Sequence, residues 1–516
     1  MNKVTKATIL LMIATMLAKI LGFVREQVLS YAYGISMYTD VYITAMTIPT
    51  VVFAGIGVAI STTFIPIFCD IENKYGERES VKFTNNILMI VIAMCTILAI
   101  LGIVFTELVV KIFAVGFTGE KLSLAVSFTR IIIISIVSIG ISNILTAYLQ
   151  LKNNFFIPGV STIPQNIIII VSILLSIKYG IYVLPWGALL GITSSLIFQI
   201  PFVYKEGFRF NPYFNLKDEY IKRIIILVGP VFLGVGVNQI NSIVDKTLAT
   251  TLNQGLLTSL SYANRLNDFV LAMFIASIAT VIYPMLSKLS INNNKEEFKK
   301  SVSKSMNIVI ILMIPITVGA IVLSSPIVKL LFERGAFNAD ATKVTSIALS
   351  MYAIGMVAFG LRNILDKVFY SLQDTKTPMK NGIISVCLNI VLNIILIKFM
   401  GHAGLALATS LSSIICVVLF CYSLKKKIGD YGQISIIKTI IKSIIASIVM
   451  GIITGISYTK ISEIIGSSTI EQVISLFITI CIGVVVYGLM IILLKIEEVT
   501  IIIDNIKEKL GRGKQI

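Results

Sequence analysis

Long apolar runs dominate the pattern of this chain. A run of about 20 apolar residues can cross the ~30 Å hydrocarbon core of a membrane as a helix. Runs of this length recur from residue 7 to residue 494, and their number predicts an all-α polytopic membrane protein with about fourteen transmembrane helices. The expected spans are residues 7–33, 38–68, 84–113, 123–150, 156–177, 183–203, 224–250, 257–286, 306–332, 344–371, 379–400, 403–424, 436–458 and 468–494.

Composition agrees with the pattern. The 516 residues are 56% hydrophobic and 13% charged, whereas soluble domains carry roughly 25% charged residues. No small-residue cleavage site follows the basic start and first apolar run, so we expect a retained first span rather than a signal peptide. The six cysteines are scattered, without a CxxC pair, and predict neither a disulfide framework nor a zinc site.

The basic residues are distributed unevenly between the two sides of the membrane. With fourteen spans, 28 of the 43 Lys and Arg residues fall on the side of the termini, 8 on the opposite side and 7 inside spans. Loops rich in Lys and Arg stay in the cytoplasm, so both termini are predicted to be cytoplasmic. Topology therefore accounts for most of the +17 net charge. We expect contact with membrane lipids and no binding of nucleic acid.

The chain matches itself at an offset of 217 to 220 residues. The matched positions are Tyr42 with Tyr262, Phe64-Ile65-Pro66 with Ile282-Tyr283-Pro284, Val110-Lys111-Ile112 with Val328-Lys329-Leu330, Pro158 with Pro378, and Gly187-Ala188-Leu189 with Gly404-Leu405-Ala406. Each repeat holds six spans, and an even number returns the chain to the same side. The halves are therefore predicted to be parallel repeats, a geometry typical of transporters.

This repeat predicts the domain organisation. Two six-helix lobes, residues 1–204 and 224–427, would enclose a central cavity and give alternating access by rocking. Residues 205–223 form a basic and aromatic linker, which either lies at the membrane interface or is solvated. Residues 428–497 form helices thirteen and fourteen outside the repeat, and residues 498–516 form a cytoplasmic tail.

Charged residues interrupt the first two spans. Lys19, Arg25 and Glu26 lie in the first span, and Asp40 begins the second. Each ionisable group at membrane depth costs at least ~2.5 kcal/mol, so such groups usually face a cavity and indicate a substrate path. Lys19 and Glu26 share a helix face while Arg25 points elsewhere, so one partner cannot satisfy all three. Cations in a cavity favour an anionic substrate such as a phosphate or pyrophosphate.

The second repeat carries further polar groups inside its spans. Arg362 and Asp366, four residues apart on one helix face, are expected to form an ion pair or to extend to the interface. Arg130 is likewise expected to extend to the interface. A second set offers oxygen ligands for a monovalent cation, although Asn pairs in membrane helices more often bond helix to helix. Its members are Asp245, Asn389, Asn393 and Thr409. The single histidine, His402, is expected to have a loop role.

Enzyme motifs are absent. The chain has no GxSxG, HExxH or P-loop sequence, so we expect no enzymatic activity, no cofactor and no transport driven by bound ATP.

Several segments together resemble the MurJ (MviN) family. They are 19–26 (KILGFVRE), Thr39-Asp40, Ile48-Pro49, Phe64-Ile65-Pro66, 262–266 (YANRL), 331–337 (LFERGAF) and 373–378 (QDTKTP). The family belongs to a superfamily of multidrug, oligosaccharide-lipid and polysaccharide exporters. The resemblance implies a flippase that moves lipid II, the undecaprenyl-pyrophosphate-linked peptidoglycan precursor, across the bacterial cytoplasmic membrane. Other cell-wall synthesis proteins are implied as partners.

The resemblance also implies site residues. The cavity residues of the family fall on Lys19, Arg25, Asp40 and Arg265, with Glu26 beside them, and the two extra helices imply a groove for the lipid tail. Arg25 and Arg265 are expected to hold the pyrophosphate. The chain departs from the family after Pro49, because residues 50–57 lack the Arg pair and Glu that many members carry there.

The energy source and the substrate remain open at this point. The membrane potential, or Na+ or H+ at Asp245, is expected to reset the empty carrier. The alternatives are a flippase for another polyprenyl-linked oligosaccharide, a cation-coupled drug exporter of the same superfamily, or a membrane-bound glycosyltransferase.

Overall fold

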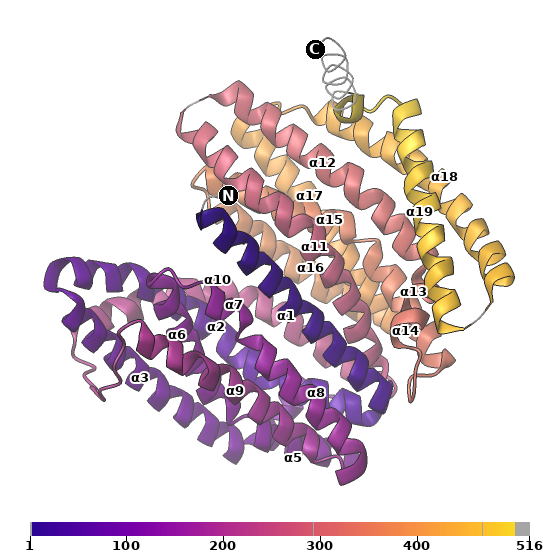
Figure 1. The fold of residues 1–516 in the computed structure, drawn as a ribbon. Coiled ribbons are helices and arrows are strands. Elements are labelled where there is room, and N and C mark those ends of the chain that lie inside the picture. The colour runs from indigo at the N-terminus through magenta and orange to yellow at the C-terminus, as the bar shows by residue number, and fades with distance from the viewer. Residues whose placement is uncertain (1–2, 293, 467, 501–516) are drawn as a thin grey trace. The chain divides into compact units, whose positions relative to one another are not determined.

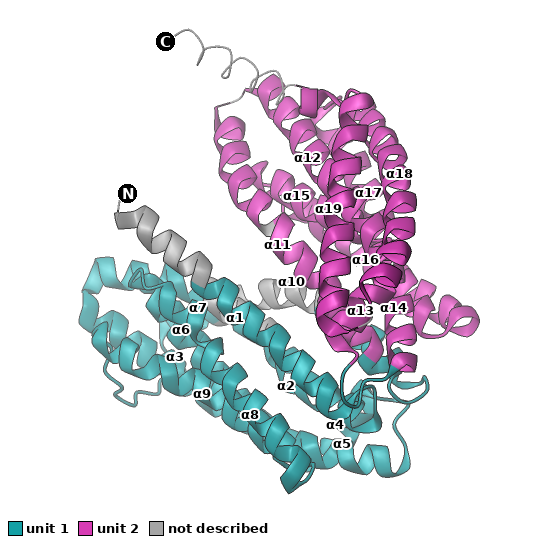
Figure 2. Cartoon of the chain, turned by 45° about the vertical axis from the view of Figure 1, so that its right-hand side comes forward, with its two compact units in different colours: residues 1–258, 334–338 teal, residues 259–333, 339–516 magenta. Residues whose placement is uncertain are grey.

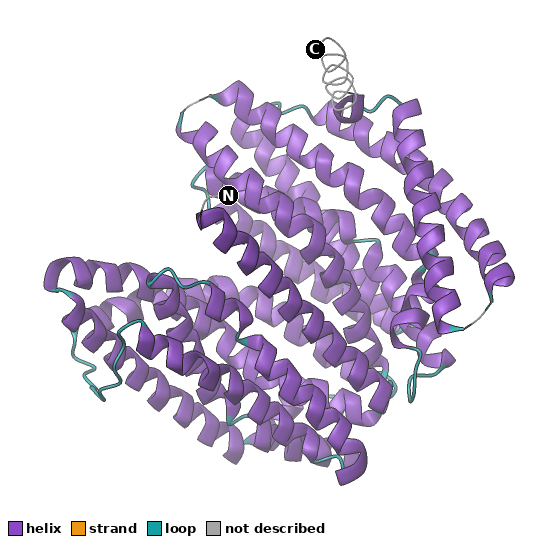
Figure 3. Ribbon diagram, viewed as in Figure 1, coloured by secondary structure: helices purple, strands orange, loops and turns teal. Residues whose placement is uncertain are grey.

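A computed structural model describes residues 3–292, 294–466 and 468–500, without the side chains of residues 3–13, 54–56, 58–62, 225–238 and 276. Every regular element in these ranges is a helix (Figure 3). In chain order (Figure 1) they are α1 (Lys3–Tyr33), α2 (Met37–Tyr75), α3 (Glu77–Val104), α4 (Thr106–Phe113), α5 (Gly119–Ile132), α6 (Ser135–Leu151), α7 (Phe156–Val160), α8 (Thr162–Tyr179), α9 (Val183–Lys205), α10 (Glu219–Thr250), α11 (Leu256–Ile291), α12 (Lys295–Val322), α13 (Ser324–Phe332), α14 (Ala339–Ala353), α15 (Met356–Ser371), α16 (Lys376–Met400), α17 (His402–Ile428), α18 (Gln433–Ile465) and α19 (Thr469–Leu493).

The number of membrane spans differs from the expectation. In the described ranges, eight helices are long and apolar enough to cross a membrane, and up to eleven spans result if each of three bent helix pairs is one span. The predicted count of fourteen is therefore not confirmed. The remaining three expected spans correspond to α1, α2 and α10, each of which runs over residues outside the described side chains.

The helices group into two compact units (Figure 2). Unit 1 comprises residues 1–258 and 334–338, and unit 2 comprises residues 259–333 and 339–516. The internal repeat places α10 at the start of the second lobe, but α10 packs along α2 and belongs to unit 1. The short segment 334–338 also belongs to unit 1, although helices of unit 2 flank it on both sides. The lobe boundaries given above stay predictions.

Two expected spans, 84–113 and 306–332, are broken near one end. The first breaks at Phe105 (φ −100°, ψ 27°) between α3 and α4, and the second at Leu323 (φ −99°, ψ 17°) between α12 and α13. At the first break the Thr106 hydroxyl donates to the carbonyls of Gly102 and Ile103, both at 2.7 Å. Such side-chain bonds compete with the helical ladder and bend helices. The two breaks are 218 residues apart, so the backbone repeats with the sequence.

The turn between α6 and α7 has the same form as the turn between α15 and α16. Asn153 and Gln373, 220 residues apart, adopt φ values of 59° and 57°, which non-glycine residues rarely take. The next residue, Asn154 or Asp374, then accepts a hydrogen bond from the backbone N–H three positions on. The bends at α5/α6 and α14/α15 also agree, at 41° and 42°. The two halves thus share the backbone geometry of turns even where their amino acids differ.

The linker after α9 is held tightly against α3. Asn85 donates to the carbonyl of Arg209 at 3.0 Å and accepts from the N–H of Asn211 at 2.9 Å. Its neighbour Asn86 forms the same pair of bonds with the backbone of Asn215, at 3.0 and 2.8 Å. Each asparagine side chain therefore both donates to and accepts from the linker backbone, as the backbone of a neighbouring β-strand would. The linker is a docked segment of unit 1 rather than a solvated tether.

We expect the Asn85→Ala/Asn86→Ala double variant to release this linker. Four backbone bonds are lost, and at about 1 kcal/mol each the local opening free energy should fall by at least 2 kcal/mol after relaxation. Hydrogen–deuterium exchange at residues 209–217 should then be about 30-fold faster or more. Asn292→Ala, at an exposed position, is the control. Unchanged exchange in the double variant would contradict the docking.

The turn at Asp374 should make stability depend on pH. Burial disfavours the charged carboxyl, but bonds from Lys427 and Thr377 outweigh this and lower the pKa of Asp374 to about 2. A depressed pKa stabilises the fold above about pH 4, and this contribution disappears as the pH falls toward 2.

Asp374→Asn, which copies the Asn154 of the first repeat, should remove that part of the acid sensitivity. The loss at neutral pH should be below about 1 kcal/mol because Lys427 is partly exposed. Thermal unfolding of the purified chain between pH 7 and pH 2 measures both effects, with Asp430→Asn in the next loop as the control. Identical acid profiles for wild type and Asp374→Asn would refute the assignment.

Candidate functional site

Arg25 of α1 is paired where α1 packs against α8. Its Nη2 lies 2.7 Å from Oε1 of Glu26, and its Nη1 donates to Oδ1 of Asn166 at 3.2 Å. Gly22, one turn earlier, faces the same residue: a Cβ there would lie 3.8 Å from the Asn166 amide nitrogen, an ordinary van der Waals contact. Tyr42 of α2 is buried close enough to interact electrostatically with both charges. The predicted cation thus lies among polar side chains of unit 1.

This arrangement leaves Arg25 able to bind an anion. Among the described residues its guanidinium makes two hydrogen bonds, to Glu26 and Asn166, from a total of five N–H donors. Its side chain is 20% exposed and that of Glu26 is 11% exposed. Removing both charges from water costs several kcal/mol for each ion. Arg25 donates to two acceptors through these bonds, and the other N–H groups of its planar fork take no part in them. A guanidinium fork suits bidentate binding of a phosphate oxygen pair.

Lys19 lies on the same helix but differs from Arg25 in its surroundings. It is exposed, and no ion pair to it is found within the part of the chain that the structure describes. With Arg25 and Glu26 compensating each other, Lys19 gives this stretch of α1 a local charge of about +1. The local field therefore favours an anion near the helix.

Asp40 is bound on all sides by groups of unit 1. Its Oδ2 lies 2.8 Å from Nζ of Lys121 and accepts the N–H of Gly255 at 2.8 Å. Its Oδ1 accepts from the N–H and the hydroxyl of Thr258, at 3.0 and 2.6 Å. The side chain is 1% exposed. In this state Asp40 orients a basic neighbour, Lys121, and caps the start of α11.

Backbone segments meet closely around Asp40. Gly255 (φ +82°) has no room for a side chain, because a Cβ would lie 2.6 Å from the carbonyl oxygen of Ile35. Gly34 (φ +56°) faces the carbonyl of Ala336 in the same way, and the N–H of Ala336 donates to the Tyr31 carbonyl at 2.9 Å. Segment 334–338 is therefore bonded to the α1–α2 turn within unit 1.

Arg265, the other predicted arginine, lies on α11 in unit 2. It is exposed and interacts electrostatically with Asp268, which accepts a bond from Asn264 at 3.3 Å. Arg25 and Arg265 thus belong to different units. Their joint binding of one ligand stays a prediction.

The four residues of the predicted cation site also belong to different units. Asn389 of α16 donates to the hydroxyl of Thr409 on α17 at 3.4 Å and accepts from Asn393 at 2.8 Å. Asp245 lies on α10 in unit 1, where Asn241 donates to it at 3.4 Å. Asn389 thus forms a helix-to-helix bond, as the alternative interpretation expects, whereas the bond from Asn393 to Asn389 lies within α16. The four-residue cation site stays a prediction.

The expected ion pair between Arg362 and Asp366 is not formed. The two groups interact electrostatically, but no bond of 4 Å or less joins them in the described ranges. Lys367 instead lies over the rings of Tyr283 and Tyr370, at 5.6 and 5.9 Å. Spacing on one helix allowed the pair, but it does not ensure that the two side chains meet.

Sequence reasoning missed the partners that define the site. Asn166 is a polar residue inside the expected span 156–177, and that contrast was a usable signal. Lys121 stands just before the expected span 123–150, where a basic residue is common and gives no signal. His402 is the first residue of α17, and its Nε2 lies 3.1 Å from the carbonyl oxygen of Val344.

Known proteins resemble this chain over most of its length. A family model described as "Lipid II flippase MurJ" matches residues 29–474. A probable lipid II flippase MurJ of Buchnera aphidicola from Acyrthosiphon pisum is 32% identical over 79% of this chain and 81% of its own. The lipid II flippase MurJ of Burkholderia cenocepacia is 27% identical over 80% and 82%.

Solved structures of known proteins also resemble this chain. One titled "Lipid II flippase MurJ, inward closed conformation" superposes with a TM-score of 0.81 at 29% identity, and covers 93% of this chain and 98% of that one. An inward-facing multidrug resistance MATE transporter shares the fold, with a TM-score of 0.70 at 11% identity over 82% of this chain and 99% of that one.

We expect Asp40→Asn to destabilise the chain strongly. The variant leaves Lys121, whose side chain is 12% exposed, without its counter-charge, and breaking a buried pair in this way costs about 3 kcal/mol. Glu107→Gln is the matched control, because the Lys111–Glu107 pair is 56% and 62% exposed and its loss should cost under about 1 kcal/mol. Thermal unfolding in detergent compares the two. Equal unfolding temperatures would show that Asp40 is not a structural anchor.

Proposed function

Since the chain belongs to the MurJ family of lipid II flippases, we propose that it carries lipid II from the cytoplasmic to the outer leaflet of the bacterial cytoplasmic membrane by alternating access. The substrate is a lipid-linked pyrophosphate, and the chain is a transporter rather than an enzyme. Both termini are assigned to the cytoplasm from the distribution of basic residues.

The observation that carries this proposal is the binding of Arg25 by Glu26 and Asn166. A guanidinium at membrane depth is energetically costly, so it is usually paired and has a functional role. Here the partners fix its orientation through two bonds, at 2.7 and 3.2 Å, which use two of its five N–H donors. Pyrophosphate oxygens match the planar fork of Arg better than the point charge of Lys.

The other predicted site residues take supporting roles in the proposal. Lys19 adds positive charge along α1 and attracts the pyrophosphate, while Glu26 holds Arg25 in place. Arg265 binds the same headgroup from α11. Asp40 acts through Lys121 and the α10–α11 turn, as its bonds at 2.8 Å support, and it stabilises a closed arrangement of the loops around it.

The remaining parts of the proposal concern the lipid tail and the energy source. α18 and α19, which follow the repeat, pack against each other and against α12, and we assign them the polyprenyl tail. The empty carrier is reset by the membrane potential, or by Na+ or H+ at Asp245 with Asn389, Asn393 and Thr409. Other cell-wall synthesis proteins are the proposed partners.

Complementation tests the proposal. The resident lipid II flippase is depleted in a bacterium, this chain is expressed, and growth and lipid II translocation are measured. The wild-type chain should restore both. Arg25→Ala should lower translocation by about 10- to 100-fold, as expected for the loss of a charge-assisted contact worth about 1.5–3 kcal/mol. Arg25→Lys should retain an intermediate level.

Arg130→Ala is the control, because Arg130 is exposed on α5. Full translocation by a well-expressed Arg25→Ala variant would contradict the proposed site. Failure of the wild-type chain, despite normal amounts in the membrane, would favour a different polyprenyl-linked oligosaccharide as substrate.

A further inference from the structure

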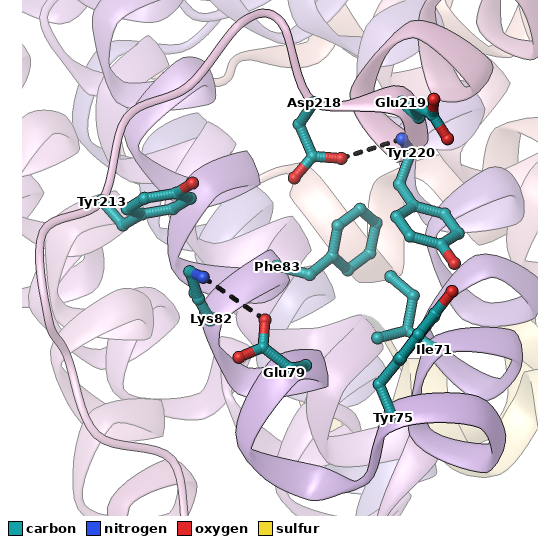
Figure 4. A pocket seen from close by; sticks show the side chains of 9 residues that line it. All are labelled: Ile71, Tyr75, Glu79, Lys82, Phe83, Tyr213, Asp218, Glu219 and Tyr220. Atoms are coloured by element: carbon teal, nitrogen blue, oxygen red, sulfur yellow. Dashed lines mark hydrogen bonds and ion pairs between the residues drawn. The ribbon is translucent and has the colours of Figure 1, made fainter.

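A cavity of about 350 Å³ lies at the end of unit 1 where α2, α3 and the linker meet α10 (Figure 4). Aromatic rings form much of its wall: those of Tyr75, Phe83, Tyr213 and Tyr220. Phe83 and Tyr220 pack edge to face with 6.1 Å between their centroids. The flippase mechanism proposed above uses none of these residues.

Carboxylates outnumber cations in this cavity, although the whole chain is strongly basic. Glu79, Asp218 and Glu219 line it, and Lys82 is the only basic residue in its lining. One oxygen of Asp218 caps α10 by accepting the Tyr220 N–H at 2.8 Å, and the other is directed into the cavity (Figure 4). The lining residues themselves therefore carry more negative than positive charge.

Lys82 shows how such a group is bound. Its ammonium lies 3.4 Å from a carboxylate oxygen of Glu79 and 5.0 Å from the centroid of the Tyr213 ring. Carboxylates and ring faces together are the usual surroundings of an organic cation. Among the described residues no group of acidic, His or Cys side chains is close enough to hold a metal ion. The cavity therefore suits an ammonium group better than a divalent metal.

The cavity wall is ordered before any ligand arrives. Asn86 fixes the linker backbone at Asn215, and the Asn215 amide donates to the Tyr213 hydroxyl at 3.3 Å. Asp218 is fixed by its cap bond. A ligand would thus not have to order this segment on binding, which lowers the entropic cost of association.

The cavity residues lie just outside three expected spans, which end at residue 68 and begin at residues 84 and 224. At about 1.5 Å per helical residue, Phe83 and Tyr220 lie ~2 and ~6 Å from the hydrocarbon boundary. The headgroup layer on each side of a bilayer is roughly 5–7 Å thick. Phe210 and Phe214 of the linker are 44% and 53% exposed, as is typical of side chains that insert at this interface.

We propose that this cavity binds the headgroup of a phospholipid that carries a primary amine. The ammonium lies between the carboxylates of Glu79 and Asp218 and against the aromatic wall, and Glu219 adds negative charge at the edge of the cavity. Lys217 and Lys222 are exposed and flank the lining residues in the sequence, and we assign them the phosphate of the same headgroup.

Lipid retention tests the proposal with phosphatidylethanolamine as the probe. The full chain is equilibrated in detergent with equal amounts of phosphatidylethanolamine and phosphatidylglycerol, and the bound lipids are measured by native mass spectrometry. Wild type should retain the ethanolamine lipid in preference. Glu79→Gln and Glu219→Gln should each weaken that preference about threefold, and the double variant about tenfold.

Glu296→Gln, at a position with an 86% exposed side chain at the start of α12, is the matched control and should leave the preference unchanged. The thermal unfolding of each variant checks that the chain is folded. Equal retention of the two lipids by wild type, or equal retention by wild type and a folded double variant, would overturn the proposal. Binding of N-acetyl-lysine amide without any lipid preference would also overturn it, in favour of a basic protein segment.

Lipid II translocation by the Glu79→Gln/Glu219→Gln variant separates this inference from the proposed function. The lipid site does not depend on the substrate of the flippase. Loss of phosphatidylethanolamine preference with translocation intact is the expected result.

Discussion

Charged groups between apolar helices must be paired, and in this chain the pairing of Asp40 connects several helices. Its two carboxylate oxygens receive bonds from Lys121, Gly255 and Thr258, which come from α5, the α10–α11 turn and the first turn of α11. No apolar contact could specify the same arrangement, because apolar helices slide past one another at little cost in lipid. The carboxylate fixes where these segments meet, and close glycine contacts follow from it.

Arg25 shows the same constraint with a different outcome. Asp40 is satisfied by protein groups at both oxygens, whereas Arg25 uses only some of its donors within the described ranges. The first is therefore suited to a structural role and the second to contact with a ligand. Two charges that looked equivalent in the sequence are distinguished by what surrounds them.

Much of the fold could be predicted from the sequence, because apolar runs and the repeat near offset 220 are long-range patterns that many residues share. The helical class and the position of turns such as Asn153 and Gln373 follow from them. Side-chain partners could not be predicted in the same way. Arg362 and Asp366 are well spaced for an ion pair on one helix, yet the pair is not formed within the described ranges, and the adjacent Lys367 lies over the ring of Tyr283 on α11. Asn166 and Lys121 lie 141 and 81 residues from the charges they bind, a separation that no local pattern reports.

The docking of the linker on α3 also limits where the chain can gain or lose residues. Asn85 and Asn86 hold the backbone at positions 209–211 and at 215, and Asp218 caps α10 only a few residues later. The chain is held at each of these points, so inserted residues would displace either the hydrogen bonds of Asn85 and Asn86 or the Asp218 cap of α10. Length variation among relatives should therefore collect before residue 209, where the chain leaves α9, while the segment from 209 to 219 keeps a constant length even as its residues diverge.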